Sequence, residues 1–196
     1  ANYERTIDQR VTLSDLRSYL TEDDCQCLVE ACGREDVLVW AVKRTGYSRW
    51  NRIQPGDMVL FHRDKRIISA ASVTYTCHSP ALATNLWGED ETDGAVWEYV
   101  YFLDNLHEED IALEDFNRVV GYELNAAHQG FNVLNQVKSD LALAEYDFNG
   151  FNTRLEHLVD AIDVEPDNPR LANVRGEQAE LRRRLLRGRS VAPCSI

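Results

Sequence analysis

Short apolar runs alternate with turn-forming residues from position 37 onward, and this pattern predicts a β-sheet. Four runs of strand length, rich in β-branched and aromatic residues, occupy residues 37–42, 58–62, 67–75 and 96–103. The second run follows the turn sequence Gln-Pro-Gly-Asp at 54–57, and the charged residues 63–66 separate it from the third. Small residues in the middle of the third run favour a strongly curved sheet, because small side chains fit where strands bend.

Helical patterns precede and follow these strands. Residues 21–24 (Thr-Glu-Asp-Asp) have the form of a capping box, and the helix that they begin is expected to end at Gly33. Other helical patterns lie at 111–123, 133–140, 153–164 and 171–189. We therefore predict an α+β fold in three parts: an N-terminal helical segment at 1–34, a sheet domain at 35–150, and C-terminal helices with a basic linker at 151–196.

Composition narrows the class of protein. No apolar run is long enough to span a membrane, and the charged N-terminus lacks the apolar core of a signal peptide, so we expect a cytoplasmic protein without membrane contact. Five cysteines without framework spacing argue against a disulfide scaffold. The net charge of −12 is unevenly distributed, because seven arginines and two glutamates follow residue 169.

Aromatic residues gather around one short connection. Two of the four tryptophans, Trp40 and Trp50, lie with Tyr47 around the polar loop between the first two strands. Such residues can be walls of a pocket for a flat ligand, since every base offers two π-faces for stacking. The alternative is ordinary packing at a strand end. Trp97, inside the fourth run, is interpreted as a core residue.

An ordered series of short motifs resembles a known family. The series comprises Val-Trp-Ala-Val at 39–42, Trp50, Pro-Gly-Asp at 55–57, Val-Leu-Phe-His at 59–62, the small residues 69–73, Leu-Trp-Gly at 86–88 and the aromatic residues 96–102. It resembles the EVE/YTH branch of PUA-like domains and, more closely, the base readers of modification-dependent restriction systems, including McrB-type N-terminal domains. The resemblance covers about residues 37–135. It implies a PUA-like curved sheet, or incomplete β-barrel, with flanking helices.

The same resemblance implies which residues form the site. A flipped or unpaired modified base would enter an aromatic pocket formed by Trp40, Tyr47, Ser48, Trp50, Leu86, Trp87, Gln129 and Asn132. Phosphates would contact the basic residues of the neighbouring loop, Lys43, Arg44, Arg49 and Arg52. Which residue serves as the second tryptophan of the pocket is left open among Tyr47, Trp50, Trp87 and Tyr99.

The C-terminal residues carry a second resemblance. Residues 181–196 are similar to the lead-in of HNH nuclease domains, in which a basic helix precedes a zinc knuckle, and Cys194 would be the first zinc ligand of a truncated knuckle. An ordinary frayed tail is the alternative. The chain itself shows no catalytic motif and no metal-ligand spacing. No cofactor is expected for it, whereas a divalent metal and structural zinc are expected for the missing nuclease domain.

Together these observations favour a binding domain. We expect recognition of a modified base in double-stranded DNA by base flipping, as the specificity domain of a modification-dependent, type IV-like restriction endonuclease. The alternative is an RNA-binding PUA-like module without an attached nuclease, because RNA recognition also stacks unpaired bases on aromatic side chains. A homodimer, the kind of modification and the sequence context are left open.

Overall fold

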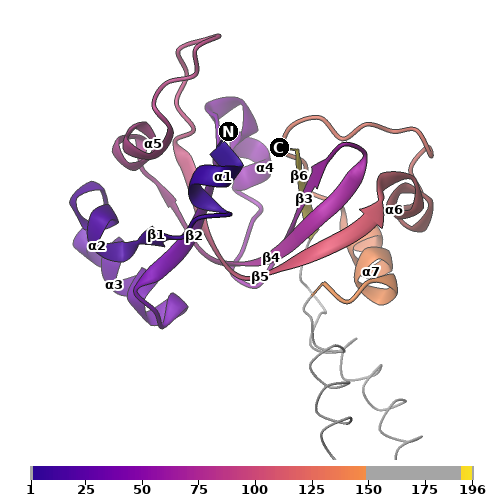
Figure 1. The fold of residues 1–196 in the computed structure, drawn as a ribbon, viewed down its shortest axis with the longest axis horizontal. Helices are drawn as coiled ribbons and strands as arrows, with labels where there is room; N and C mark the ends of the chain where they lie inside the picture. Colours follow the sequence, from indigo (N-terminus) through magenta and orange to yellow (C-terminus); the bar gives the residue numbers. More distant parts are fainter. Residues whose placement is uncertain (1, 149–190, 196) are drawn as a thin grey trace, which may run out of the picture.

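The computed structural model describes residues 2–148 and 191–195, and its centre is one curved sheet. The strands are β1 (Val11–Thr12), β2 (Asp36–Val42), β3 (Met58–Arg63), β4 (Arg66–His78), β5 (Tyr99–Ala112) and β6 (Val191–Ser195). Their order in the sheet is β1-β2-β5-β4-β3-β6. The neighbouring pairs β1–β2, β2–β5, β5–β4 and β4–β3 are antiparallel, and β6 pairs parallel with β3. The sheet is open and has helices at both ends, so the predicted α+β fold with a curved sheet is confirmed (Figure 1).

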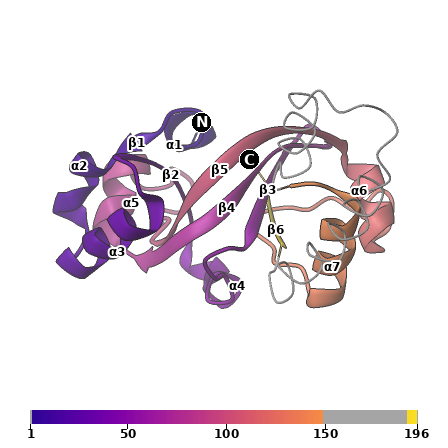
Figure 2. The ribbon, with the colours of Figure 1, turned by 90° about the horizontal axis from the view of Figure 1, so that it is seen from below.

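Seven α-helices and two 3₁₀ turns surround the described part of this sheet. The helices are α1 (Asn2–Thr6), α2 (Leu13–Leu16), α3 (Glu22–Cys32), α4 (Tyr47–Trp50), α5 (Pro80–Trp87), α6 (Leu113–Val120) and α7 (Gln136–Glu145), and the 3₁₀ turns are η1 (Arg17–Tyr19) and η2 (Arg44–Gly46). Figures 1 and 2 show α2, α3 and α5 grouped at one end of the long strands, with α6 and α7 at the other.

The curvature arises in β4 and β5, the two longest strands. Their pairing shifts register three times, between Ile67 and Ser69, between Ala70 and Ser72, and near Val73. Such irregularities bend a strand and increase its twist. They fall on or beside the small residues that the sequence placed at a bend, and Ala70 is fully buried there.

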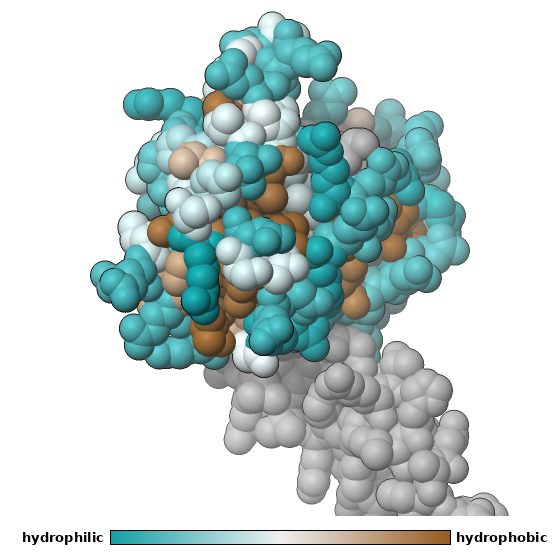
Figure 3. Space-filling view, turned by 60° about the vertical axis from the view of Figure 1, so that its left-hand side comes forward, coloured by the Kyte–Doolittle hydropathy of each residue, from teal (hydrophilic) through white to brown (hydrophobic). Residues whose placement is uncertain are grey.

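Three hydrophobic clusters hold the helices on the sheet. One cluster lies around Trp40, Phe61 and Tyr101, and another joins α2, α3 and α5 to the opposite face of β2 and β5. The third lies under α6 and α7 and includes Phe116. In the space-filling view of Figure 3 hydrophilic residues dominate the surface, and hydrophobic residues show only between them.

The predicted capping box at the start of α3 and the predicted glycine stop at its end are both confirmed. The Thr21 hydroxyl accepts a hydrogen bond from the Asp24 amide at 3.1 Å, and the Asp24 carboxylate accepts one from the Thr21 amide at 3.3 Å. Gly33 follows the last turn with φ of 61°, a conformation that glycine adopts without steric cost. The same carboxylate accepts a hydrogen bond from the Tyr75 hydroxyl at 2.7 Å, which links α3 to β4.

Two parts of the structure differ from the sequence analysis. The fourth strand begins at Tyr99 rather than at 96, so Trp97 lies in the irregular segment that leads into β5. Residues 191–195, assigned to the linker, instead form β6 on the outer edge of β3. Pro193 is tolerated there because an edge strand needs no backbone donor on its open side. The helices predicted at 153–164 and 171–189 fall outside the described residues. Within the described ranges, none of the helices combines the length and apolar character needed to cross a bilayer.

Candidate base-binding pocket

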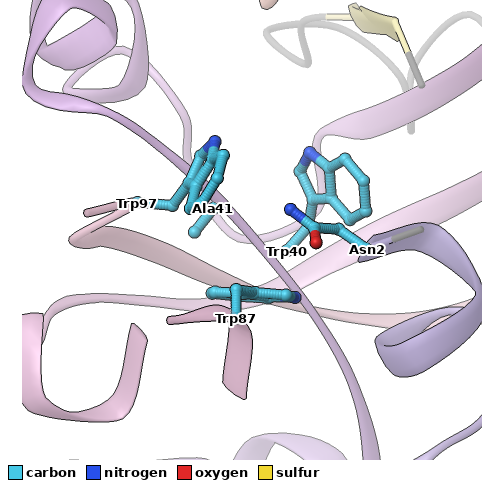
Figure 4. A pocket seen from close by; sticks show the side chains of 5 residues that line it. All are labelled: Asn2, Trp40, Ala41, Trp87 and Trp97. Atoms are coloured by element: carbon cyan, nitrogen blue, oxygen red, sulfur yellow. The ribbon is translucent and has the colours of Figure 1, made fainter. Parts of the chain in front are cut away.

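One small opening in the described structure is lined by three tryptophans. They are Trp40 of β2, Trp87 at the end of α5 and Trp97 before β5, and Ala41 and Asn2 complete the lining. We call these three side chains the tryptophan cage. In Figure 4 the indoles of Trp40 and Trp97 stand on opposite sides, and the indole of Trp87 lies across a third side. The space between them is about 180 Å³, including its open mouth.

Trp40 is the fixed wall of the cage. Its indole is 9% exposed and packs edge-on against Phe61, with ring centroids 5.4 Å apart, and against Tyr3 at 6.3 Å. Tyr3 is itself fixed, because its hydroxyl and the Ser69 hydroxyl are hydrogen-bonded at 2.7 Å. Edge-to-face contacts of this kind orient aromatic rings beyond simple area burial. The plane of this wall is therefore set before any ligand enters.

Trp87 supplies a second wall and a polar atom. The helix that carries it begins at Ser79, whose hydroxyl accepts from the Leu82 amide at 3.2 Å and donates to the Tyr19 carbonyl at 2.7 Å. Gly88 ends the helix with φ of 74° and turns the chain away. Trp87 is 8% exposed, and its indole nitrogen is buried without a hydrogen-bond partner in the described part of the chain. Leaving a buried donor unpaired costs roughly 1–3 kcal/mol, which a ligand acceptor would recover.

Trp97 is positioned by Lys43. The Lys43 ammonium lies 5.0 Å from the centre of the Trp97 ring and forms ion pairs with Asp90 at 2.8 Å and Asp93 at 2.9 Å. The hydrogen bond to Asp90 raises the pKa of Lys43, and Lys43 in turn lowers the pKa of Asp90 to about 2. The loop is closed by Asp93, which accepts from the Ala95 amide at 3.0 Å. We call this arrangement of Lys43, Asp90, Asp93 and Trp97 the lysine latch.

Polar groups at the cage suit the edge of a base. Asn2 of α1 directs its amide toward the opening in Figure 4, and an amide both donates and accepts hydrogen bonds. Beside it, β2 pairs with β5 on one side, while on the other side β1 reaches only residues 36 and 37. Among the described residues no strand therefore covers the outer edge of 38–42. Stacking surfaces and hydrogen-bonding groups converge at this point.

The predicted pocket residues divide into two groups. Trp40 and Trp87 line the opening, and Leu86 lies partly buried beside them in the cluster around α5. Tyr47 and Trp50 lie elsewhere, in contact with Tyr99, because the Trp50 indole donates to the Val100 carbonyl at 3.2 Å.

Three further predicted pocket residues also lie outside the lining. Ser48 is exposed on α4, and Gln129 is exposed on the segment before Phe131. Asn132 donates to the Gln129 carbonyl at 3.3 Å, within that same segment. The opening is lined without them, because the chain folds this segment against Tyr101 rather than against the cage.

The predicted phosphate-binding residues have several roles. Lys43 belongs to the lysine latch. Arg49 donates to the Phe131 carbonyl at 3.1 Å, and Arg52 donates to the Leu134 carbonyl at 3.3 Å, so both join the α4 region to the segment around residue 131. Arg44 is exposed, and its side chain makes no hydrogen bond or ion pair with another described residue.

Trp97 and Asn2 are the residues that the sequence analysis missed. Trp97 was interpreted as core because it stands in an apolar run, but the strand begins two residues later and the indole is only partly buried. The turn sequence around Gly94 was the signal that the strand could start later. Asn2 carries no local signal, since only the packing of α1 against β2 and α5 brings it to the cage.

Histidine, cysteine and carboxylate side chains do not assemble into a metal site in the described part: no group of three or more is placed to hold an ion. The side chain of Cys194, the predicted first ligand of a zinc knuckle, is outside what the structure describes. That prediction therefore stays a prediction.

Comparisons with known proteins give one likeness. No family model matches the chain, and no curated protein matches it. Among solved structures it is similar to the N-terminal domain of Thermococcus gammatolerans McrB bound to m5C DNA, with a TM-score of 0.41 and 16% identity over 63% of this chain and 76% of that chain. No family membership follows. A likeness this distant establishes neither fold nor function, so the proposal below depends on this chain's own side chains.

Proposed function

We propose that this domain recognises a modified base in DNA by taking the base, flipped out of the helix, into the tryptophan cage. The observation that carries the proposal is the convergence of Trp40, Trp87 and Trp97 from three separate segments on one small opening. Asn2 directs its amide toward the same opening, and the Trp87 indole nitrogen is buried without a hydrogen-bond partner in the described part of the chain.

The energetics favour a flat aromatic ligand. Extruding a base from a duplex costs a few kcal/mol. Stacking on an aromatic side chain contributes roughly 1–3 kcal/mol per base, and a cage offers a wall to each face. The opening is lined by three indoles, so its walls offer stacking surfaces to a flat aromatic group.

Selection of a modified base needs an enclosed site. One methyl group contributes only about 0.8 kcal/mol of burial, a factor of roughly four in affinity. Trp40 supports such discrimination because it is buried and fixed by two neighbouring rings, and it cannot move aside for a poorly fitting base. The modification itself is assigned by the binding assay described below.

Charge supports DNA as the partner. In a chain with a net charge of −12, residues 37–56 contain Arg44, Arg49 and Arg52 and no acidic residue, whereas Lys43 in the same stretch is paired with Asp90 and Asp93. Phosphate neutralisation supplies most of the affinity that is independent of sequence. Asp90 and Asp93 are ion-paired with Lys43, so in this proposal the DNA backbone approaches over the arginines of the α4 region and not over the acidic loop 89–93.

The restriction context is part of the same proposal and depends on sequence alone. The basic residues from 170 onward support an association with an HNH nuclease domain, to which this reader would direct cleavage, whereas Pro193 and Cys194 belong to β6 of the sheet. Expression of the chain with whatever sequence follows it in its gene, and cleavage assays on modified and unmodified DNA with a divalent metal, test that part separately.

The base-reader proposal is tested by competition binding on short duplexes of one sequence at fixed salt. The duplexes carry unmodified bases, N6-methyladenine, 5-methylcytosine or 5-hydroxymethylcytosine. We expect a preference of tenfold or more, about 1.4 kcal/mol, for one modification. Trp97→Ala should abolish the preference, and it is a better probe than Trp40→Ala, because removing a buried tryptophan costs roughly 3–5 kcal/mol of stability.

Tyr122→Ala is the matched control. Tyr122 also has a lysine over its ring, with the Lys138 ammonium 3.7 Å from the centroid, but it lies beside α6 and α7. This variant should keep the preference. Equal binding of all four duplexes by the wild-type protein would refute the proposal, and a preference for single-stranded RNA would favour the alternative module.

A further inference from the structure

A second group of aromatic rings lies outside the tryptophan cage. Tyr99 pairs with Val42 on one side and with His78 on the other, at the end of the long strands. The His78 ring stacks on Tyr99 with centroids 4.7 Å apart and planes inclined by 26°, and Tyr47 contacts Tyr99 at 5.0 Å. Trp50 contacts both tyrosines, at 5.2 and 6.2 Å. We call these four rings the aromatic platform.

The platform is both exposed and fixed. Tyr47 is 46% exposed, and the side chain of His78 is 50% exposed. Trp50 is tied to the Val100 carbonyl, and the His78 ring nitrogen lies 2.9 Å from a Glu98 carboxylate oxygen. Core packing does not account for rings left half in solvent, whereas preorganised rings lower the cost of binding a stacking ligand.

Arginine side chains lie in the same stretch of chain as the platform. Tyr47 and Trp50 belong to residues 37–56, which contain Arg44, Arg49 and Arg52 and no acidic residue, although Glu98 contacts His78 on the other side of the platform. Arg44 is exposed and its side chain has no hydrogen bond or ion pair within the described part, so its guanidinium is available to a phosphate. Aromatic rings for bases beside cations for phosphates form the combination that single-stranded nucleic acid requires.

The platform and the cage are close along the same strands. Trp40 of the cage and Val42 beside the platform are two positions apart on β2, about 6.5 Å at the rise of a strand. Trp97 and Tyr99 are likewise separated by two positions in the sequence. These short separations favour contact of the platform by the nucleotide adjacent to a base held in the cage.

We propose that the aromatic platform binds an unpaired nucleotide next to the base held in the cage, with its base stacked on Tyr47 and its phosphate at Arg44. The occupant is a DNA strand, and the contact is independent of the modification. This inference rests on the proposed function of the cage for the position of the nucleotide. The free energy of binding at the platform can be measured separately, because its side chains differ from those of the cage.

Binding of unmodified single-stranded DNA, alongside modified and unmodified duplexes at fixed salt, tests the platform. Tyr47→Ala should lower the affinity for all three by a similar factor, roughly 5- to 150-fold, and leave the preference for the modified duplex unchanged. Tyr47→Phe keeps the ring and should retain wild-type affinity. Arg44→Ala should flatten the dependence of affinity on salt.

The outcomes separate the two sites. Trp97→Ala should lose the preference while keeping its affinity for unmodified single strands, and Tyr122→Ala should change neither quantity. Wild-type affinities in Tyr47→Ala, with an unchanged melting temperature, would overturn the platform and leave the cage standing. If Tyr47→Ala lowers the affinity for single strands and the wild-type protein shows no preference for the modified duplex, the platform is supported and the cage is refuted. Failure of the wild-type protein to bind any of the three DNAs overturns both.

Discussion

The sequence and the structure assign Lys43 different roles, and a substitution at this position distinguishes the two roles. From sequence it is a phosphate contact; in the structure its ammonium lies over Trp97 and between Asp90 and Asp93. Lys43→Met keeps the aliphatic length of the side chain and removes its charge. The variant therefore releases the lysine latch with little change in packing.

The size of the effect follows from the contacts. A lysine over an aromatic ring at a solvent-accessible site contributes roughly 0.5–1 kcal/mol, so loss of this contact should lower the preference for modified DNA about two- to fivefold. The ion pairs are at the surface, where such pairs contribute little and are screened by salt. The effect should therefore be larger at low ionic strength. Lys43→Arg, which keeps the charge, should retain most of the preference.

The assay is the same duplex competition, repeated over a range of salt concentrations. If Lys43 positions Trp97, then Lys43→Met lowers the preference and leaves the salt slope for unmodified duplexes unchanged. A phosphate contact predicts the reverse: equal weakening on all duplexes and a slope reduced by about 0.9. Lys138→Met, which removes the ammonium over Tyr122, is the control and should alter neither quantity. An unchanged preference for modified DNA in Lys43→Met, together with a smaller dependence of affinity on salt, would refute the proposed role of Lys43 in the lysine latch.

Two further predictions concern buried polar groups beside α6. Asn117 is fully buried, donates to the Leu124 and Ala126 carbonyls at 3.1 and 3.0 Å, and its side-chain oxygen lies 2.6 Å from the His128 ring nitrogen. Asn117→Ala should therefore lower the free energy of unfolding, measured by urea titration, by roughly 2–4 kcal/mol. A loss below half of that would show that the loop rearranges. Burial lowers the pKa of both His62 and His128, so the unfolded chain binds protons first and stability should fall as the pH drops below about 6.5. His62→Gln should reduce this fall between pH 7.5 and 5.5, and an identical fall in the variant would exclude His62 as a contributor.

Local chemistry predicted much of this fold. The cap at Thr21, the stop at Gly33 and the bend at the small residues of β4 are all set by neighbouring residues, and each lies where the sequence placed it. β6 could not be found in this way, because a five-residue strand after a long connection depends on the open edge of β3 and carries little signal of its own.

The candidate site shows the same division. Trp40 and Trp87 were found from motifs that resemble a family, whereas Trp97 and Asn2 reach the cage only through tertiary packing. Arg49 and Arg52 were predicted to bind phosphates because their loop is basic, and that stays a prediction; the structure adds that each also donates to a carbonyl far along the chain. The sequence shows which side chains carry charge, but the contacts that each charged group makes depend on the tertiary structure.

The long pair β4 and β5 also determines how the molecule opens. The strands have 13 and 14 residues and supply side chains to all three hydrophobic clusters. We therefore expect amide hydrogens along their shared ladder to exchange with solvent only when the whole domain unfolds, whereas loops with few buried contacts exchange through local fluctuations. Trp40 lies on β2, which pairs with β5, whereas Trp97 follows the surface loop that the ion pairs of Lys43 hold. The wall of the cage formed by Trp40 is therefore expected to stay fixed, and the wall formed by Trp97 to move when a ligand enters, without opening of the sheet.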